Sequence, residues 1–358
     1  MDRLDRLRHE IQQQGWDAAW VTKAANRQYL SGFTGSAGWV LVPAQGKPVL
    51  VTDGRYTQQA RLEAGKCKVI ITAKDPLAVM TNWFKSKKIK KLAFEDDDVS
   101  VAAWKKVKSL NPKLRGTGIQ SLIEQIRAVK DAEEVNNIKK AIKIAQKAFE
   151  EVAERIRPGI SERGLAFEME KCMFKGGSEG LAFPTIVASG PRSSLPHGQP
   201  TDRKLRSGDL VILDFGCTVK GYHSDLTRTV VVGKINQKQK ELYKIVKKAQ
   251  KISQKLIFSG QKCSDSDKKA REIFKEAKLE KYFVHSLGHG LGQDVHELPR
   301  LSGSSKDEFK TGMVVTCEPG IYLPGWGGVR IEDDLLVQAK VSLWLSQSPE
   351  ELRVVGKR

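Results

Sequence analysis

The first part of the chain alternates two patterns of apolar and polar positions. Three segments have the apolar spacing that is typical of amphipathic helices: residues 2–14, 76–87 and 101–110. Four short apolar runs have the composition of strands: residues 18–23, 38–43, 48–53 and 68–73. This alternation predicts a small α/β domain. Proline and glycine interrupt the chain at "LNPKLRGTGIQ", so we expect the domain to cover residues 1–120 and a second domain to cover residues 121–358.

The second region repeats one pattern. It contains two predicted helices, a loop with a histidine and two β-like runs, in this order: residues 131–156, 162–176, 195–198, 209–216 and 224–233. The same order recurs further on: residues 237–257, 266–279, 285–297, 313–322 and 327–337. Such recurrence predicts that the domain is built from two related halves.

Each half carries two acidic residues in apolar surroundings. Asp214 and Asp225 belong to the first pair of β-like runs, and Glu318 and Glu332 occupy similar places in the second. Any one of these acids alone is explained by a structural salt bridge or a strand-end cap. Four of them, placed symmetrically, indicate a shared site.

The four acids need positive charge. Asp214 interrupts "LVILDFG", a run that reads as a buried strand, where an unpaired carboxylate would lose several kcal/mol of hydration. Arg330 is two residues from Glu332 and can neutralise one acid at most. Four inward carboxylates on two hairpins therefore predict a pair of divalent cations about 3.5–4 Å apart. Since a nitrogen donor is expected to join the oxygens, we favour Mn, Co, Fe or Zn over Mg or Ca.

The segment "HSLGHGLGQDVHE" holds three of the six histidines: His285, His289 and His296. Its alternating glycines make a regular helix unfavourable, so the spacing does not support a three-histidine metal site. Four carboxylates already supply most of the ligands. One neutral imidazole completes the set, which leaves two histidines for hydrogen bonding or proton transfer.

Composition narrows the class of protein. The formal net charge is +19, but the lysines follow helical patterns without interleaved aromatic residues, so we do not expect nucleic acid as the main partner. The five cysteines are widely spaced and form no C-x-x-C pair. No apolar run approaches the roughly 20 residues of a membrane span, and the N-terminus is charged. We expect a cytoplasmic protein without a membrane partner.

Residues 122–352 resemble the "pita-bread" metallopeptidases, a group that includes methionine aminopeptidase, aminopeptidase P, prolidase and creatinase. The resemblance rests on "SLPHGQPTDRKLRSGDLVILDFG", "YHSDLTRTVVVG", "HSLGHGLGQDVHE" and "GMVVTCEPGIYLPGWGGVRIEDDLLV". The motifs "LPHG" and "GHG…VHE" resemble those of the Xaa-Pro branch of this group, which comprises aminopeptidase P and prolidase. The resemblance implies a creatinase/prolidase-like N-terminal domain and a curved antiparallel sheet covered by helices, with metals in its concavity.

The resemblance also implies a role for each site residue. Five residues would hold two metal ions: Asp214, Asp225, His289, Glu318 and Glu332. Among them Asp225 and Glu332 would bridge both ions, and Glu318 would also accept the proton of the attacking water.

Four further residues would surround this centre. His197, His285 and His296 would be non-ligand histidines that position the substrate and stabilise the developing oxyanion. Arg330 would hold the bridging carboxylates in place.

The implied reaction is metal-dependent hydrolysis of the bond between an N-terminal residue and proline, with Mn as the expected metal and Co or Zn as alternatives. The substrates would be proline-containing peptides or dipeptides, and the resemblance implies a homodimer. We favour an Xaa-Pro aminopeptidase because "NRQYLSGFTGSAGWVLV" resembles small bacterial enzymes of that kind. An Xaa-Pro dipeptidase shares the same centre and is the alternative, and a non-catalytic binding protein on this scaffold is a remote one.

Overall fold

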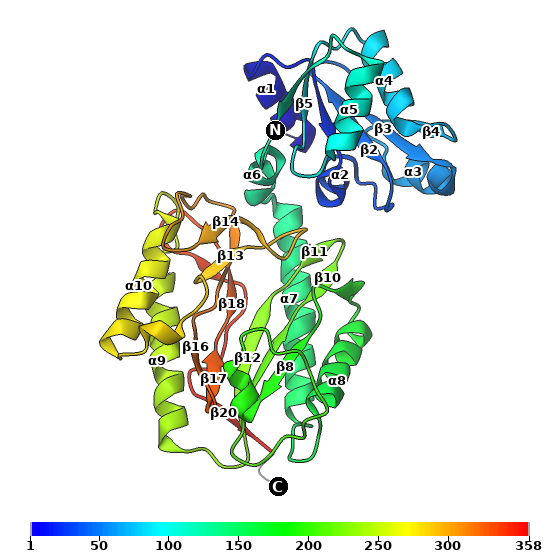
Figure 1. Ribbon diagram of the computed structural model, residues 1–358. Helices are drawn as coiled ribbons and strands as arrows, with labels where there is room; N and C mark the ends of the chain where they lie inside the picture. The colour runs from blue at the N-terminus through cyan, green and yellow to red at the C-terminus, as the bar shows by residue number, and fades with distance from the viewer. Residues whose placement is uncertain (1, 357–358) are drawn as a thin grey trace. The chain divides into compact units, whose positions relative to one another are not determined.

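The computed structural model describes residues 2–356 and divides the chain into two compact units, Met1–Arg127 and Ala128–Arg358 (Figure 1). The division falls later than residue 120 because helix α6 (Leu122–Ala128) belongs largely to the first unit. Its Ile123 is fully buried in a core cluster that also contains Leu7 and Val40.

The first unit is a six-stranded sheet with helices packed on it. The strand order is β4-β3-β2-β1-β5-β6, with antiparallel pairing for β1/β2 and β2/β3 and parallel pairing elsewhere. The strands are β1 (Ala18–Val21), β2 (Trp39–Pro43), β3 (Val49–Asp53), β4 (Lys68–Thr72), β5 (Lys91–Phe94) and β6 (Arg115–Gly118). The helices are α1 (Arg3–Gln13), α2 (Ala24–Ser31), α3 (Thr57–Glu63), α4 (Pro76–Ser86) and α5 (Val101–Leu110).

The four predicted strands and three predicted helices of this unit are all present. The pattern missed β5, β6, α2 and α3. Strand β6 reads "RGTG" and is exposed throughout, so it has no apolar alternation to reveal it. It exists because its backbone pairs with β5 at the edge of the sheet.

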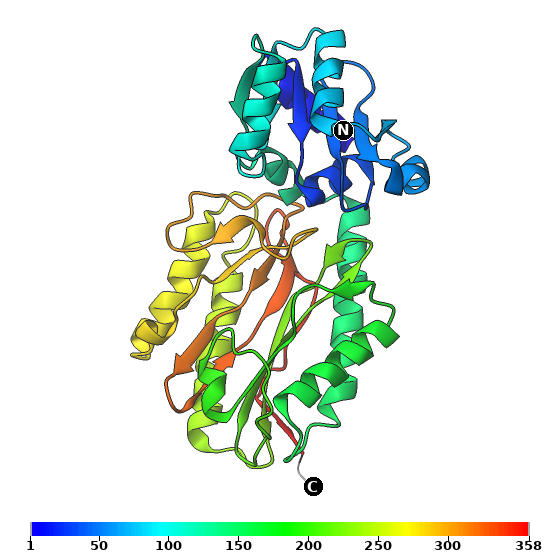
Figure 2. The same cartoon turned by 45° about the vertical axis from the view of Figure 1, so that its right-hand side comes forward.

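The second unit has two helix pairs, one for each predicted half: α7 (Ala132–Ala153) with α8 (Glu162–Lys175), and α9 (Gln237–Gln254) with α10 (Cys263–Glu276). Both long helices begin with a capping box, in which the residue before the helix and the third helical residue bond reciprocally: Asp131 with Glu134, and Asn236 with Gln239. The two pairs flank the strands on opposite sides (Figures 1 and 2).

The strands of the second unit form several linked sheets. One has the order β20-β12-β9-β8 and another β14-β13-β15-β18-β19, while β16 and β17 pair with each other and β11-β10-β7 form a small sheet. The strands of the first half are β7 (Gly180–Leu181), β8 (Ile186–Ser189), β9 (Leu210–Phe215), β10 (Cys217–Val219), β11 (Tyr222–His223) and β12 (Leu226–Val232). Those of the second half are β13 (Gly288–Gly290), β14 (Glu297–Leu301), β15 (Val314–Cys317), β16 (Gly320–Leu323), β17 (Gly327–Arg330), β18 (Asp333–Leu336), β19 (Leu343–Trp344) and β20 (Arg353–Val355).

Two details differ from the sequence interpretation. The runs 313–322 and 327–337 are each broken into two strands, at Glu318-Pro319 and at Ile331-Glu332. At the first break Pro319 lacks the N–H that would continue a ladder. At both breaks the chain leaves one sheet and enters another beside the glutamate. The sheets are also not wholly antiparallel, since β20 pairs with β12 in parallel.

Among residues 2–356, no helix is both long enough and apolar enough to cross a membrane.

Candidate metal centre

The four acidic residues lie at the ends of two antiparallel strand pairs. Asp214 is in β9, where it pairs with Thr227 of β12. Asp225 directly precedes β12. Glu318 follows β15 and Glu332 precedes β18. The Glu332 amide donates to the Thr227 carbonyl at 3.3 Å, which joins the two halves and brings both strand ends to one place.

His289 is the histidine that reaches these acids. Its Nε2 lies 3.3 Å from Glu318 Oε1 and 3.6 Å from Asp225 Oδ2. Its Nδ1 is 3.0 Å from the Gly290 carbonyl, which only accepts, so the Nδ1 proton is committed and Nε2 faces the carboxylates. This is the tautomer that a metal ligand requires.

Glycine allows His289 to reach this position. His289 is the middle residue of β13, and a Cβ on Gly288 would lie 2.2 Å from the Thr316 carbonyl oxygen. A Cβ on Gly290 would lie 2.1 Å from the Leu298 carbonyl oxygen. The expectation that this segment is not helical is confirmed. The glycines permit close approach of three backbones.

The acids repel one another in the absence of cations. Burial raises the pKa of Asp225 well above its usual range, and the charges of Glu332 and Asp214 raise it further. Burial followed by the charges of Glu318 and Asp214 does the same for Glu332. Burial alone would also raise the pKa of Glu318. Without metal, however, Glu318 raises the pKa of His289 against the effect of burial, and the protonated ring donates from Nε2 to Glu318. This hydrogen bond and charge hold the pKa of Glu318 at about 2.

The donor set fits divalent metal ions. Ligand atoms of Asp225, His289 and Glu332 all lie within 4.8 Å of one another. Among the described residues, the buried Oδ1 of Asp214 has no hydrogen-bond partner, although such an atom is costly to leave unsatisfied. Cations among these atoms would relieve the repulsion and satisfy the oxygen, and the oxygen-rich set with one imidazole suits Mn, Co, Fe or Zn.

Arg330 connects the acids to the surrounding groups. Its Nη2 is 2.6 Å from Asp214 Oδ2. Its Nε donates to Thr227 Oγ1 at 2.9 Å, and that hydroxyl donates to Glu332 Oε2 at 2.7 Å. The ion pair of Arg330 is therefore with Asp214, whereas Glu332 is reached through Thr227.

His285 has both ring nitrogens occupied. Its Nδ1 lies 2.8 Å from the Ser286 carbonyl and therefore donates, so the neutral ring accepts at Nε2 from the Tyr322 hydroxyl at 2.9 Å. Tyr322 in turn accepts from Arg330 Nη1 at 2.8 Å. Burial lowers the pKa of His285, which keeps the ring neutral. In this arrangement His285 is not a metal ligand.

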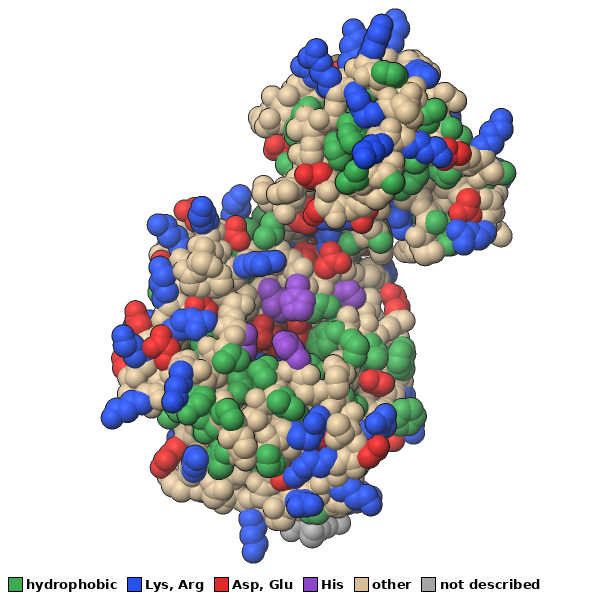
Figure 3. Space-filling view, viewed as in Figure 1, with side chains coloured by type: hydrophobic (Ala, Val, Ile, Leu, Met, Phe, Trp, Pro, Cys, Tyr) green, Lys and Arg blue, Asp and Glu red, His purple; other side chains and the backbone are tan. Residues whose placement is uncertain are grey.

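His197 and His296 are exposed. His296 stacks obliquely on His289 with ring centroids 4.3 Å apart. The loop of His197 is held by Arg330, whose Nη1 donates to the Pro196 carbonyl at 2.9 Å. Figure 3 shows histidine side chains around a hollow in this unit, with acidic side chains on its floor. Both exposed imidazoles are therefore open to contact with a bound molecule.

Three residues of the site escaped the sequence interpretation: Thr227, Tyr322 and Asp334. Thr227 is two residues after Asp225, so strand alternation could have revealed it. Asp334 is fully buried and its Oδ2 accepts from the Asp225 amide at 3.3 Å. Asp334 is two residues after Glu332, so the same alternation could have revealed it. Tyr322 carries no signal in the sequence, because its contact with His285 depends on how separate segments pack.

We expect Tyr322→Phe to lower kcat about 10- to 100-fold, the usual effect of removing a group that orients an active-site histidine. The phenyl ring keeps the packing, while His285 Nε2 loses its donor and Arg330 loses an acceptor. Steady-state kinetics and metal content check the result. Unchanged kcat would contradict a positioning role, and loss of bound metal would show that Tyr322 acts on the metal ligands instead.

Comparison with known proteins identifies the family. Residues 136–339 match the model described as "Metallopeptidase family M24". The chain belongs to this family. Residues 3–129 match the "Creatinase/Prolidase N-terminal domain". As an M24 member the protein is a metallopeptidase, and the family implies divalent metal ions, which the acidic cluster suits.

The chain is similar over nearly its whole length to proteins with Xaa-Pro names. It is 36% identical to the "Xaa-Pro dipeptidase" of Pyrococcus furiosus, over 98% of this chain and 99% of the relative. The structure of "X-Pro aminopeptidase from Thermotoga maritima MSB8" is 37% identical with a TM-score of 0.92, covering 99% and 100% of the two chains. That of "Xaa-Pro dipeptidase from Bacillus anthracis" is 38% identical with a TM-score of 0.95, covering 99% of each. The Xaa-Pro branch inferred from the sequence motifs is confirmed.

Proposed function

We propose that this metallopeptidase hydrolyses the bond between an N-terminal residue and proline, with two divalent ions held by Asp214, Asp225, His289, Glu318 and Glu332. The observation that carries the proposal is the convergence of four acids and one correctly oriented imidazole nitrogen in a hollow. We propose Mn as the metal, with Co or Zn as alternatives.

The cations, when bound, supply the Lewis acidity that activates water and polarises the scissile carbonyl. The protein supplies position and proton transfer. Glu318 is the proton acceptor in this proposal, which is the role that the family resemblance implies for it. Its Oε1 accepts from Thr316 Oγ1 at 3.3 Å, which helps to hold the carboxylate in place.

The exposed imidazoles of His197 and His296 can form hydrogen bonds to the substrate and to the developing oxyanion in this proposal. His285, whose ring nitrogens bond to Ser286 and Tyr322, contributes by holding the Tyr322 hydroxyl in place.

The relatives support two versions of the proposal, which differ in the length of the peptide that is cleaved. The aminopeptidase version, which releases the first residue from longer chains, is supported by "SGFTGSAG" and by the Thermotoga structure. The dipeptidase version is supported by the names of the Pyrococcus and Bacillus relatives. Both use the same centre.

A peptide panel separates the two versions. We expect purified protein, stripped with a chelator and reloaded with Mn, to cleave Xaa-Pro bonds, and the stripped protein to be inactive. Xaa-Pro dipeptides and Xaa-Pro-Yaa tripeptides are compared, with Xaa-Ala-Yaa as the control peptide. Absence of tripeptide cleavage would overturn the aminopeptidase version. Cleavage of neither proline peptide with Mn, Co or Zn would overturn the proposed function.

A further inference from the structure

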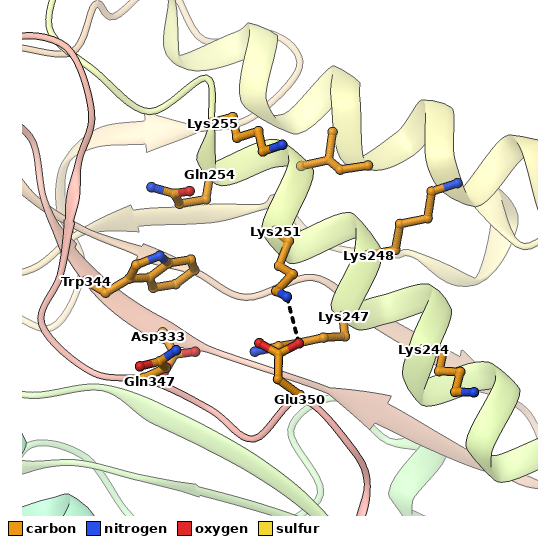
Figure 4. Close-up of a pocket in the computed structure, with 11 residues that line it drawn as sticks. Lys244, Lys247, Lys248, Lys251, Gln254, Lys255, Asp333, Trp344, Gln347 and Glu350 are labelled. Carbon is orange, nitrogen blue, oxygen red and sulfur yellow. Dashed lines mark ion pairs between the residues drawn. The ribbon is translucent and has the colours of Figure 1, made fainter.

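A second cavity lies in the unit Ala128–Arg358, between α9 and the chain segment 333–350. Its volume is about 580 Å³, within the range of small-molecule pockets. One wall is a lysine face of α9 together with the lysine that follows the helix: Lys244, Lys247, Lys248 and Lys251, and then Lys255. The opposite wall includes Trp344 and Glu350 (Figure 4).

The lysines of this cavity are poorly neutralised. Lys251 pairs with Glu350 at 2.7 Å across the opening (Figure 4), and Lys248 is 3.8 Å from Glu276. In the described part of the chain, Lys244 and Lys255 have no carboxylate within ion-pair distance. The lining acid Asp333 is already paired with Arg228 at 2.9 Å. The cavity therefore carries excess positive charge.

The burial of Lys247 distinguishes this cavity from an ordinary solvated helix face. It is only 6% exposed, and its Nζ bonds to Gln250 Oε1 and to the carbonyl and hydroxyl of Ser348, which are neutral. No carboxylate of residues 2–356 lies within ion-pair distance of it. Burial lowers its pKa. Ser348 and Gln250 connect Lys247 to the Asp333 carboxylate, but that carboxylate is already paired with Arg228. A buried ammonium with only this indirect, shared counter-charge is costly, and an anion in the cavity would add negative charge beside it.

We propose that this cavity binds a small molecule carrying a di- or triphosphate group. Lysine is a common ligand of phosphate, and several lysines on one wall match several charges on one ligand. Trp344 offers a ring face on which a nucleobase could stack. The ligand chemistry is thus a polyphosphate, either inorganic or attached to a nucleoside.

Calorimetric titration of the metal-loaded protein with tripolyphosphate and with ATP tests the proposal. We expect Lys244→Gln/Lys251→Gln to weaken binding of both probes at least about tenfold, since each lysine contributes a charge-assisted hydrogen bond. The matched control is Lys140→Gln/Lys147→Gln, which removes two exposed lysines at the same spacing on α7 and should leave binding unchanged. Equal weakening in both variants would mean diffuse surface charge and overturn the proposal.

Three further variants sharpen the test. Glu350→Gln removes the carboxylate that pairs with Lys251 and should tighten binding about threefold, which loss of folding cannot imitate. Asp225→Asn should bind both probes normally, whereas loss of binding there would place the anion at the metal centre and overturn the proposal. Trp344→Ala distinguishes the ligand source: weaker ATP binding with unchanged tripolyphosphate binding indicates a nucleotide, and equal binding of both indicates the polyphosphate group alone.

Discussion

Asp225→Asn should lower kcat/KM about a thousandfold or more, which corresponds to about 4 kcal/mol of lost transition-state stabilisation. In the proposed centre Asp225 bridges both ions, and the amide keeps the shape of the side chain but loses its charge. The carboxylate is 5% exposed, and its pKa is raised first by burial and then by Glu332 and Asp214. Metal content measured alongside the kinetics should fall with the activity.

The stability of the metal-free variant separates this effect from misfolding. Since the ionised carboxylate is disfavoured in the folded protein without metal, removing its charge should not lower, and is expected to raise, the free energy of unfolding in chelator. Asp202→Asn is the matched control, because Asp202 is 84% exposed and pairs with Arg163 at the surface. Wild-type activity of Asp225→Asn with a full metal complement would contradict the bridging role.

Arg330→Met should lower the free energy of unfolding of the metal-free protein by about 3–5 kcal/mol, the usual cost of breaking a buried ion pair from one side. Arg330 is 3% exposed and 2.6 Å from Asp214, and it also donates to Thr227, Tyr322 and the Pro196 carbonyl. Activity should fall as well, since those contacts fix Glu332, His285 and the loop of His197. Denaturant unfolding and steady-state kinetics measure the two effects.

The destabilisation should shrink when Mn is added, because a cation beside Asp214 replaces part of the lost positive charge. Arg330→Lys keeps the charge but not the fork of donors, so it should be intermediate in stability while remaining low in activity. Arg163→Met is the control, since its partner Asp202 is exposed and such surface pairs contribute little. The free energy of unfolding is compared in the presence of chelator. If Arg330→Met lowers it no more than Arg163→Met does, the role of Arg330 as the partner of Asp214 is contradicted.

The sequence predicted the elements whose apolar spacing is regular. The long helices from Ala132 and Gln237 and the strands β9 and β12 follow their patterns closely. It did not predict the two breaks. Pro319 is a local signal for the break at Glu318-Pro319 that the predicted run 313–322 passed over. The run around Ile331-Glu332 contains no proline or glycine at the break, and it looks the same whether one sheet or two receive it. Those breaks matter, since each glutamate lies where the chain passes between sheets.

In the candidate site, too, some residues could be predicted from the sequence and others could not. Acids inside apolar runs are conspicuous in a sequence, since burial of their charge needs an explanation. Tyr322 is not conspicuous, and the buried Lys247 resembles every other lysine of its helix until its surroundings are known. Their partners are distant in the chain, so pattern alone cannot assign them.

By itself, then, the sequence determined the class of fold, the repeated halves and the chemistry of four buried acids with a supporting imidazole, because periodicity and residue type are local properties. Only the tertiary structure decided that His289 directs its Nε2 to the acids while His285 is occupied by Tyr322, and that Arg330 pairs with Asp214. These facts depend on the directions of side chains from segments that are separate in the chain, 37 residues apart for His285 and Tyr322 and 116 for Arg330 and Asp214. Packing of those segments sets the directions, and no local pattern encodes them.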